Sequence, residues 1–223
     1  MTDSPQKLTP GDLAALMCAR ICHDLVSPVG ALGTALEVLD DPANTDMHAD
    51  ALDLVRLSAR QASSKLQFLR LAFGAGTSAP GFIGMDHVRG LVENMYGEGK
   101  ATFAWNAGCD GLGKAPTRLL LNLVMIGTNC IPRGGEITIN VSQKGDADLI
   151  EIKATGPRAR LDDMVTRTLT GKAPEDGFDG RSIQPFYAGM IIREIKGRID
   201  ASIQDETVTL SAFAPQAGAR SAA

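Results

Sequence analysis

His23 is the residue of this chain whose type and neighbours best suit chemistry. Asp24 follows it directly, and Arg20 and Ser27 lie about one helical turn away on either side. A neutral imidazole can act as a nucleophile or bind a metal. Asp24 could orient the ring or hold its proton, Ser27 could orient the ring, and Arg20 could face an anion. The plain alternative is a group of solvated surface side chains.

Two cysteines next to this histidine raise the question of a metal or haem. Cys18 and Cys22 precede His23 in a segment that resembles the haem-attachment pattern C-x-x-C-H with one extra residue. The observed spacing fits one face of a helix, where both thiols would act as small apolar groups. We therefore expect no metal site, and a metal protein is the least favoured alternative.

The histidine must be carried by a long helix. Thr9 and Pro10 provide an N-cap and a first helical residue, and Asp40-Asp41-Pro42 predicts the end. Apolar residues recur at intervals of three and four, at Met17, Ile21, Leu25, Pro28, Leu32, Leu36 and Leu39. His23 lies about 160–200° from Ile21 and Leu25 around this helix, so it should face solvent. Pro28 predicts a kink.

A second helix follows after a short turn and predicts an antiparallel hairpin. Its heptad seam consists of Leu52, Val55, Ala59, Ala62, Leu66, Leu69 and Phe73. Leu54, Leu57, Phe68 and Leu71 lie off that seam. One hairpin cannot bury so many apolar side chains, so we expect a homodimer that forms a four-helix bundle.

The second half of the chain has a different character. A segment rich in Gly, Pro and Ser over 75–84 predicts a boundary near 78, between a hairpin domain (1–78) and a second domain (79–223). The patterns predict helices near 85–97, 115–130, 160–169 and 183–196. They predict strands at 101–106, 136–142, 149–154, 198–203 and 207–213. The fold class is therefore α+β, a helical hairpin followed by a two-layer α/β sandwich.

Composition excludes several classes of function. The net charge of −4 and the aromatic content of 4% disfavour a nucleic-acid partner. No apolar run approaches the ~20 residues of a membrane span, and the first residues do not form a signal peptide. Four cysteines without an export signal indicate reduced thiols, so we expect a cytoplasmic protein with no membrane partner.

The segment from Cys22 to Leu32 resembles the phosphoacceptor box of bacterial sensor histidine kinases, in which an acidic residue, a leucine and a Ser-Pro or Thr-Pro pair follow the histidine. Three further segments resemble parts of the ATPase domain of those kinases, in the same order. They are Leu120–Ile139, Lys153–Pro157 and Met190–Ile199. The resemblance covers about 13–213 and implies a dimerisation hairpin followed by an ATPase-like domain.

The departures from the kinase pattern fall on nucleotide-binding positions. Ile126 stands where the kinases have a metal-binding Asn, and Mg²⁺ requires oxygen ligands. Ala154 replaces the Asp that reads adenine, and Arg158 replaces a glycine. The lid glycines, which let a backbone approach phosphates, are replaced around Pro185. We expect a degenerate ATPase-like domain that binds no ATP and holds no tightly bound cofactor.

A phosphoacceptor histidine without an ATP site resembles the ChpT-type histidine phosphotransferases of bacterial cell-cycle phosphorelays. The resemblance implies that His23 takes a phosphoryl group from the receiver aspartate of a hybrid histidine kinase. His23 then passes it to aspartates of response regulators, and the partner receiver supplies Mg²⁺. Candidate contacts with the receiver are Leu16, Ala19, Arg20, Val26 and Ser27.

Two other functions stay open. A non-catalytic dimeric adaptor for receiver domains would make His23 incidental, and transfer from a labelled receiver would distinguish the two. A residual histidine autokinase would require the nucleotide-binding residues that this sequence lacks.

Overall fold

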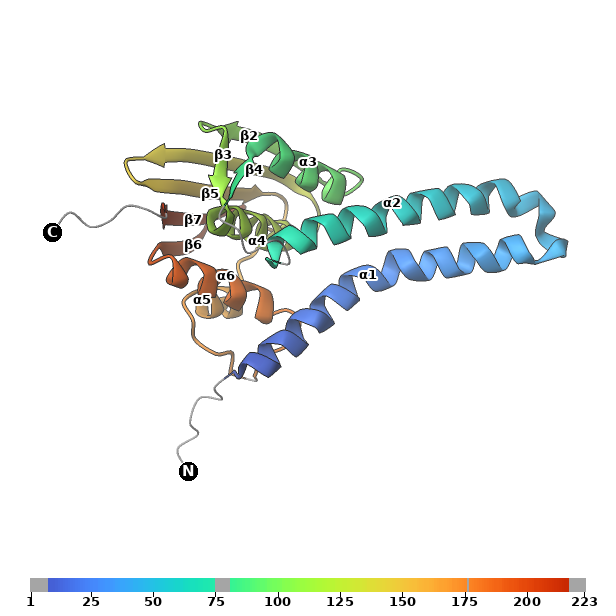
Figure 1. Ribbon diagram of the computed structural model, residues 1–223, viewed down its shortest axis with the longest axis horizontal. Helices are drawn as coiled ribbons and strands as arrows, with labels where there is room; N and C mark the ends of the chain where they lie inside the picture. The colour runs from blue at the N-terminus through green and yellow to red at the C-terminus, as the bar shows by residue number, and fades with distance from the viewer. Residues whose placement is uncertain (1–7, 75–80, 176, 217–223) are drawn as a thin grey trace, which may run out of the picture.

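The computed structural model describes residues 8–74, 81–175 and 177–216. A helical hairpin, built from α1 (Pro10–Asp40) and α2 (His48–Ala72), projects from an α/β body (Figure 1). The 3₁₀ helix η1 (Pro42–Met47) joins the two helices where a short turn was predicted. The predicted domain boundary near 78 lies outside the described residues.

The ends of α1 are fixed by the residues that predicted them. Thr9 caps the helix and forms a capping box with Asp12, and Pro10 is its first residue. At the other end, Asp41 is the C-cap, and its carboxylate accepts a hydrogen bond from the Ala43 N–H at 2.9 Å. Figure 1 shows that α1 changes direction along its length, as expected for a helix with an internal proline.

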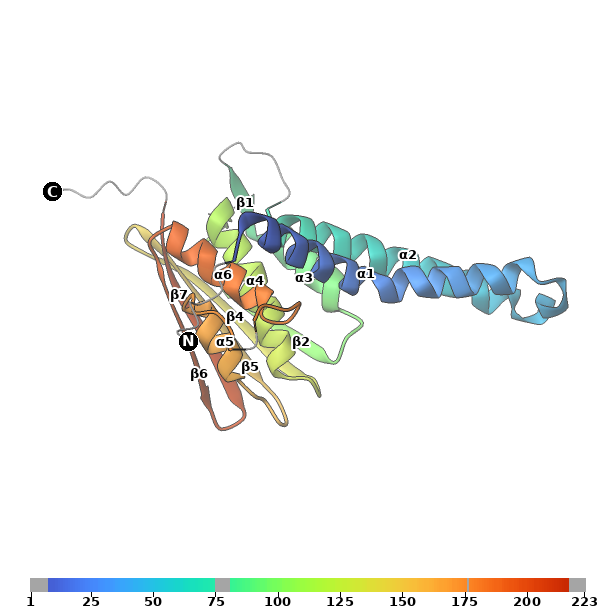
Figure 2. The same ribbon diagram turned by 90° about the horizontal axis from the view of Figure 1, so that it is seen from below.

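The α/β body confirms the predicted α+β class. Its helices are α3 (Met85–Tyr96), α4 (Lys114–Cys130), α5 (Asp163–Leu169) and α6 (Ile183–Glu194). Its five-stranded sheet has the order β2 (Ala101–Ala107), β4 (Gly135–Lys144), β5 (Ala147–Thr155), β7 (Thr207–Pro215) and β6 (Arg198–Gln204). The β2–β4 pair is parallel and the other pairs are antiparallel. The helices lie on one face of the sheet, so the body has two layers (Figure 2).

A second, two-stranded sheet was not foreseen from the sequence. It pairs β1 (Phe82–Gly84) with β3 (Gly111–Gly113) in antiparallel register. Both strands have three residues and contain glycine, so they carry no recognisable alternation of apolar and polar residues.

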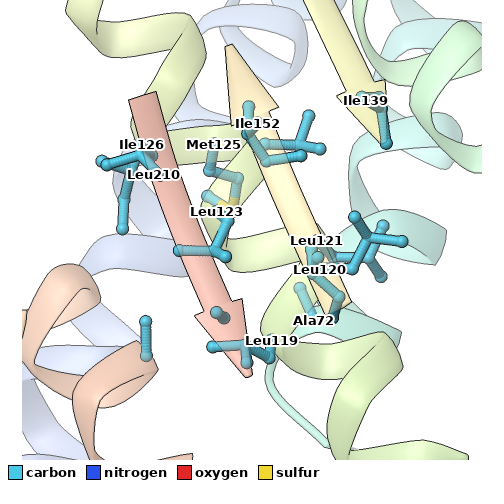
Figure 3. Packing of buried hydrophobic residues seen from close by; sticks show 14 of the residues in the cluster. Ala72, Leu119, Leu120, Leu121, Leu123, Met125, Ile126, Ile139, Ile152 and Leu210 are labelled. Atoms are coloured by element: carbon cyan, nitrogen blue, oxygen red, sulfur yellow. The ribbon is translucent and has the colours of Figure 1, made fainter. Parts of the chain in front are cut away.

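Helix α4 lies at the centre of the core. Every residue from Leu119 to Gly127 is buried, and α4 packs against β5 and α6. Gly127 allows this packing, because a Cβ there would lie 3.0 Å from the side chain of Ile152 on β5. Figure 3 shows leucines of α4 packed with Ile152 and Leu210 of the sheet.

The hairpin shares this core. Phe68, Leu69 and Ala72 of α2 are buried in the same hydrophobic cluster as α4 and the sheet. Figure 3 shows Ala72 beside residues of α4. Asn122 Nδ2 also donates a hydrogen bond to the Ala72 carbonyl at 2.8 Å. The two sequence segments are therefore packed as one body at the base of the hairpin.

Two side chains of α6 strengthen the same junction. Gln184 Nε2 donates to the Asn122 carbonyl at 3.0 Å, and the Tyr187 hydroxyl donates to the Phe73 carbonyl at 3.1 Å. Gln184 is fully buried. A chain of hydrogen bonds thus runs from α6 through α4 to the end of α2.

Within the described ranges, α1 is the one helix long and apolar enough to be considered as a membrane span. This finding qualifies the expectation that no apolar segment approaches that length. The apolar residues of α1 have another explanation, because one side packs along α2 and the neighbouring side forms an exposed stripe.

Candidate active site

His23 lies on α1 with its side chain 82% exposed to solvent. The helix turns its apolar stripe toward α2 and turns the histidine away, as the spacing predicted. Ala19 and Ser27, about one turn before and after it, are small and exposed. The imidazole is therefore open to approach by a second molecule.

The next residue holds the imidazole ring. Nδ1 of His23 lies 3.2 Å from Oδ1 of Asp24, while Arg20 Nε donates to Oδ2 of the same carboxylate at 3.1 Å. The side chains of Asp24 and Arg20 are only 13% and 16% exposed, in contrast to the histidine. Asp24 is thus fixed by Arg20 and can orient the exposed ring of His23 through Nδ1.

The α/β body also reaches this ion pair. Arg20 Nη1 donates to the carbonyl of Gly180 at 3.3 Å, in the loop that precedes α6. Asp179 stabilises that loop by accepting hydrogen bonds from the hydroxyl and the N–H of Ser182 at 2.7 Å each. Partial burial opposes ionisation of Asp179, but these hydrogen bonds outweigh it and lower its pKa.

A half-buried tyrosine of α3 lies near the same carboxylate. Burial raises the pKa of Tyr96 above its ordinary value, and the negative charge of Asp24 raises it further. The ring of Tyr96 packs edge-on against Phe68 of α2 at a centroid distance of 5.8 Å. The phenol is therefore neutral, and its ring is part of the packing between α3 and the hairpin helix α2.

The structure separates the candidate contact residues into two groups. Val26 is 68% exposed, and Ala19 and Ser27 are exposed beside His23. Leu16 is half-buried, and Arg20 is largely covered by its contacts with Asp24 and Gly180. The first group forms an accessible surface, whereas Arg20 is positioned to orient Asp24.

The residues at the expected nucleotide-binding positions take part in the packing and hydrogen bonding of this protein. Ile126 and Ala154 are buried in the core, and Pro185 is buried within α6. Arg158 takes a left-handed conformation (φ 60°), and its N–H donates to Glu206 Oε1 at 3.2 Å. Ile126, Ala154 and Pro185 thus contribute apolar atoms to the packed interior.

The cysteines do not gather around His23 as a metal-binding group. Cys18 and Cys22 are free and exposed. In the part of the chain that the structure describes, no group of three or more His, Cys, Asp or Glu side chains is arranged to hold a metal ion.

Sequence reasoning missed the contribution of α2 to this site. Lys65 Nζ donates to the main-chain carbonyl of Asp24 at 3.0 Å. Pro28 could have indicated that a donor was needed there, because it cannot supply the N–H that normally reaches this carbonyl. Which residue supplies it depends on how the two helices face each other. The sequence pattern does not specify that detail.

Comparison with known proteins is consistent with this geometry. Residues 85–207 match the family described as "Histidine phosphotransferase C-terminal domain". Protein phosphotransferase ChpT of Brucella abortus is 35% identical over 208 residues, which cover 93% of this chain and 98% of the relative.

A solved structure of a bacterial phosphotransferase superposes with a TM-score of 0.82 at 33% identity, covering 93% of this chain and 98% of that one. The family match spans the α/β body, and the similarity to both relatives includes the hairpin that carries His23. The chain therefore belongs to the histidine phosphotransferase family and acts in a phosphorelay.

Proposed function

We propose that His23 is the phosphoacceptor of this phosphotransferase and that it moves phosphoryl groups between receiver domains. The observation that carries the proposal is an exposed imidazole whose Nδ1 lies 3.2 Å from a largely buried carboxylate. Such an arrangement leaves Nε2 free and holds the ring in one orientation.

In the forward step, Nε2 attacks the phosphorus of an aspartyl phosphate on a donor receiver. The bond between phosphorus and the aspartate oxygen breaks, and the aspartate leaves as a carboxylate. Asp24 accepts the hydrogen bond from Nδ1–H and stabilises the positive charge that develops on the ring. The second step reverses these events with the aspartate of an acceptor receiver.

Phosphoryl transfer depends mainly on in-line positioning and on neutralising charge. The receiver would bring Mg²⁺, and this chain would provide the nucleophile and a surface that excludes water. Val26 and Ala19 offer exposed apolar contact beside His23, and Ser27 and Leu16 extend the same region.

The proposed active form is a homodimer. Val29 and Leu36 of α1 and Leu52 and Leu66 of α2 are between 43% and 55% exposed. Leu36 belongs to the apolar stripe, Val29 lies two turns before it on the same face, and Leu52 and Leu66 belong to the heptad seam, so a second copy could cover them and complete a four-helix bundle. His23 lies roughly 120–140° away from Val29 and Leu36 around α1 and would stay accessible.

The proposed partners are the receiver domain of a hybrid histidine kinase upstream and response regulators downstream, in a cytoplasmic cell-cycle relay. Support for this assignment comes from the resemblance of most of the chain to ChpT-type phosphotransferases. Pairwise tests against receivers from the same genome would identify the cognate ones.

The direct test is transfer of labelled phosphate between two purified receivers. A ³²P-labelled donor receiver should pass label to this protein and then to an acceptor receiver. A non-catalytic adaptor would hold both receivers and take no label. An autokinase would become labelled from Mg-ATP without any receiver.

A further inference from the structure

The proline inside α1 leaves one backbone acceptor of that helix without its usual donor. Within an α-helix, the carbonyl of Asp24 would accept a hydrogen bond from the N–H of residue 28. Residue 28 is a proline, which has no N–H and whose ring crowds that carbonyl. The affected carbonyl belongs to Asp24, the residue that immediately follows His23.

A side chain of the antiparallel helix supplies the missing donor. Lys65 of α2 donates from Nζ to the Asp24 carbonyl at 3.0 Å. The contact joins residues 41 positions apart in the sequence, and the lysine is half-buried between the helices. A fully exposed lysine would form its hydrogen bonds with water. The contact between Lys65 and the Asp24 carbonyl therefore depends on the packing of α2 against α1 in the hairpin.

Asp24 is consequently held at two of its polar groups, the carboxylate and the main-chain carbonyl. Arg20 fixes the carboxylate from within α1, and Lys65 fixes the main-chain carbonyl from α2. The imidazole of His23 bonds to that carboxylate. A change in the peptide group of Asp24 would therefore tilt the carboxylate and alter the direction of the histidine ring.

We propose that Lys65 is a positioning residue for phosphotransfer, replacing the N–H that Pro28 lacks and so fixing the His23–Asp24 pair. This inference rests on the proposed role of His23 as phosphoacceptor. Lys65 acts through Asp24 and does not touch the transferred group. Its loss should slow transfer at saturating receiver without weakening receiver binding.

The first experiment measures kcat and KM for transfer from a ³²P-labelled receiver to the protein. Lys65→Met keeps most of the aliphatic stem and removes the donor. We expect kcat to fall about tenfold, the change that ~1.4 kcal/mol would produce, and KM to stay unchanged. Lys65→Arg should recover most of the rate because it keeps a cationic donor. Lys144→Met, at an exposed position on β4, is the matched control.

The second experiment uses the proline itself. Pro28→Ala restores a backbone N–H to the Asp24 carbonyl, so Lys65 should become dispensable in that background. We expect Pro28→Ala/Lys65→Met to transfer phosphate at the rate of Pro28→Ala alone. This comparison keeps its meaning even if Lys65→Met by itself does not fold, which circular dichroism would reveal.

Three outcomes would overturn the proposal. The first is a kcat of Lys65→Met equal to that of wild type. The second is a rise in KM alone, which would make Lys65 a receiver contact. The third is a loss of kcat that is equally large when Lys65→Met is added to Pro28→Ala. Failure of the parent hypothesis looks different, because wild-type protein would then take no label at His23 from any receiver.

Discussion

The Asp24 carboxylate divides its two oxygens between Arg20 and His23. Oδ2 accepts from Arg20 Nε at 3.1 Å, and Oδ1 lies 3.2 Å from His23 Nδ1. The arginine is itself held by the carbonyl of Gly180. The orientation of an exposed imidazole is therefore determined by a largely covered ion pair, which links α1 to the loop before α6.

Replacing the proposed phosphoacceptor should abolish labelling without disturbing the fold. We expect His23→Ala to take up no phosphate from a labelled receiver and to keep its oligomeric state, since the side chain is 82% exposed. His87→Ala is the control, because His87 is exposed on α3. Acid-labile label on His23→Ala after gel electrophoresis would contradict the assignment.

Replacing the orienting carboxylate should slow transfer but not eliminate it. Asp24→Asn weakens the hydrogen bond to the histidine ring and leaves Arg20 without its charge partner. A hydrogen bond to a charged group is worth ~1.5–3 kcal/mol, so the rate should fall about tenfold or more in rapid-quench measurements. Asp53→Asn, in an exposed pair with Arg56, serves as the control. A wild-type rate for Asp24→Asn would assign the orientation of His23 to another group.

A charge on the exposed apolar stripe should separate the proposed dimer. Leu36 is 51% exposed, and burying a glutamate there against a second copy would leave its charge unpaired. Leu36→Glu should sediment as a monomer at micromolar concentration. Leu54→Glu should not, because Leu54 is 38% exposed but lies off the heptad seam. A wild-type chain that is already monomeric would disprove the dimer.

Restoring the acid that kinases use for adenine should destabilise the protein and not confer nucleotide binding. Ala154 is fully buried, so Ala154→Asp would place an unpaired carboxylate in the core. This change should lower the free energy of unfolding by ~3–5 kcal/mol. Lys153→Asp, a substitution at the exposed neighbouring residue, should lower the free energy of unfolding by about 1 kcal/mol or less. Urea denaturation followed by Trp105 fluorescence measures both. Titration calorimetry with Mg-ATP should detect no binding to wild type, and tight binding would refute the prediction.

The sequence predicted regular elements well where periodicity was strong. The helix that carries His23 begins at Pro10 and is capped by Asp41, as its terminal residues indicated. The exposure of His23 followed from its angle to Ile21 and Leu25 alone. These features depend on local spacing, which a single sequence records directly.

Features that depend on how helices meet could not be predicted in the same way. Lys65, Tyr96 and Gly180 reach the candidate active site from three different elements. Their separation in sequence from His23 is large, and a lysine, a tyrosine or a glycine has no periodic signature of such a role. The shared core at Phe68 was missed for a similar reason, because a boundary inferred from glycine and proline content takes no account of packing.

The junction at Phe68, Leu69 and Ala72 has a consequence for how receivers exchange phosphate. Because these residues are buried with α4 and the sheet, the hairpin cannot swing without exposing apolar surface to water. Each docking receiver therefore meets a preformed surface and incurs no entropic cost for ordering two domains. Under the proposed mechanism each His23 accommodates one receiver at a time, so donor and acceptor receivers compete for the same surface.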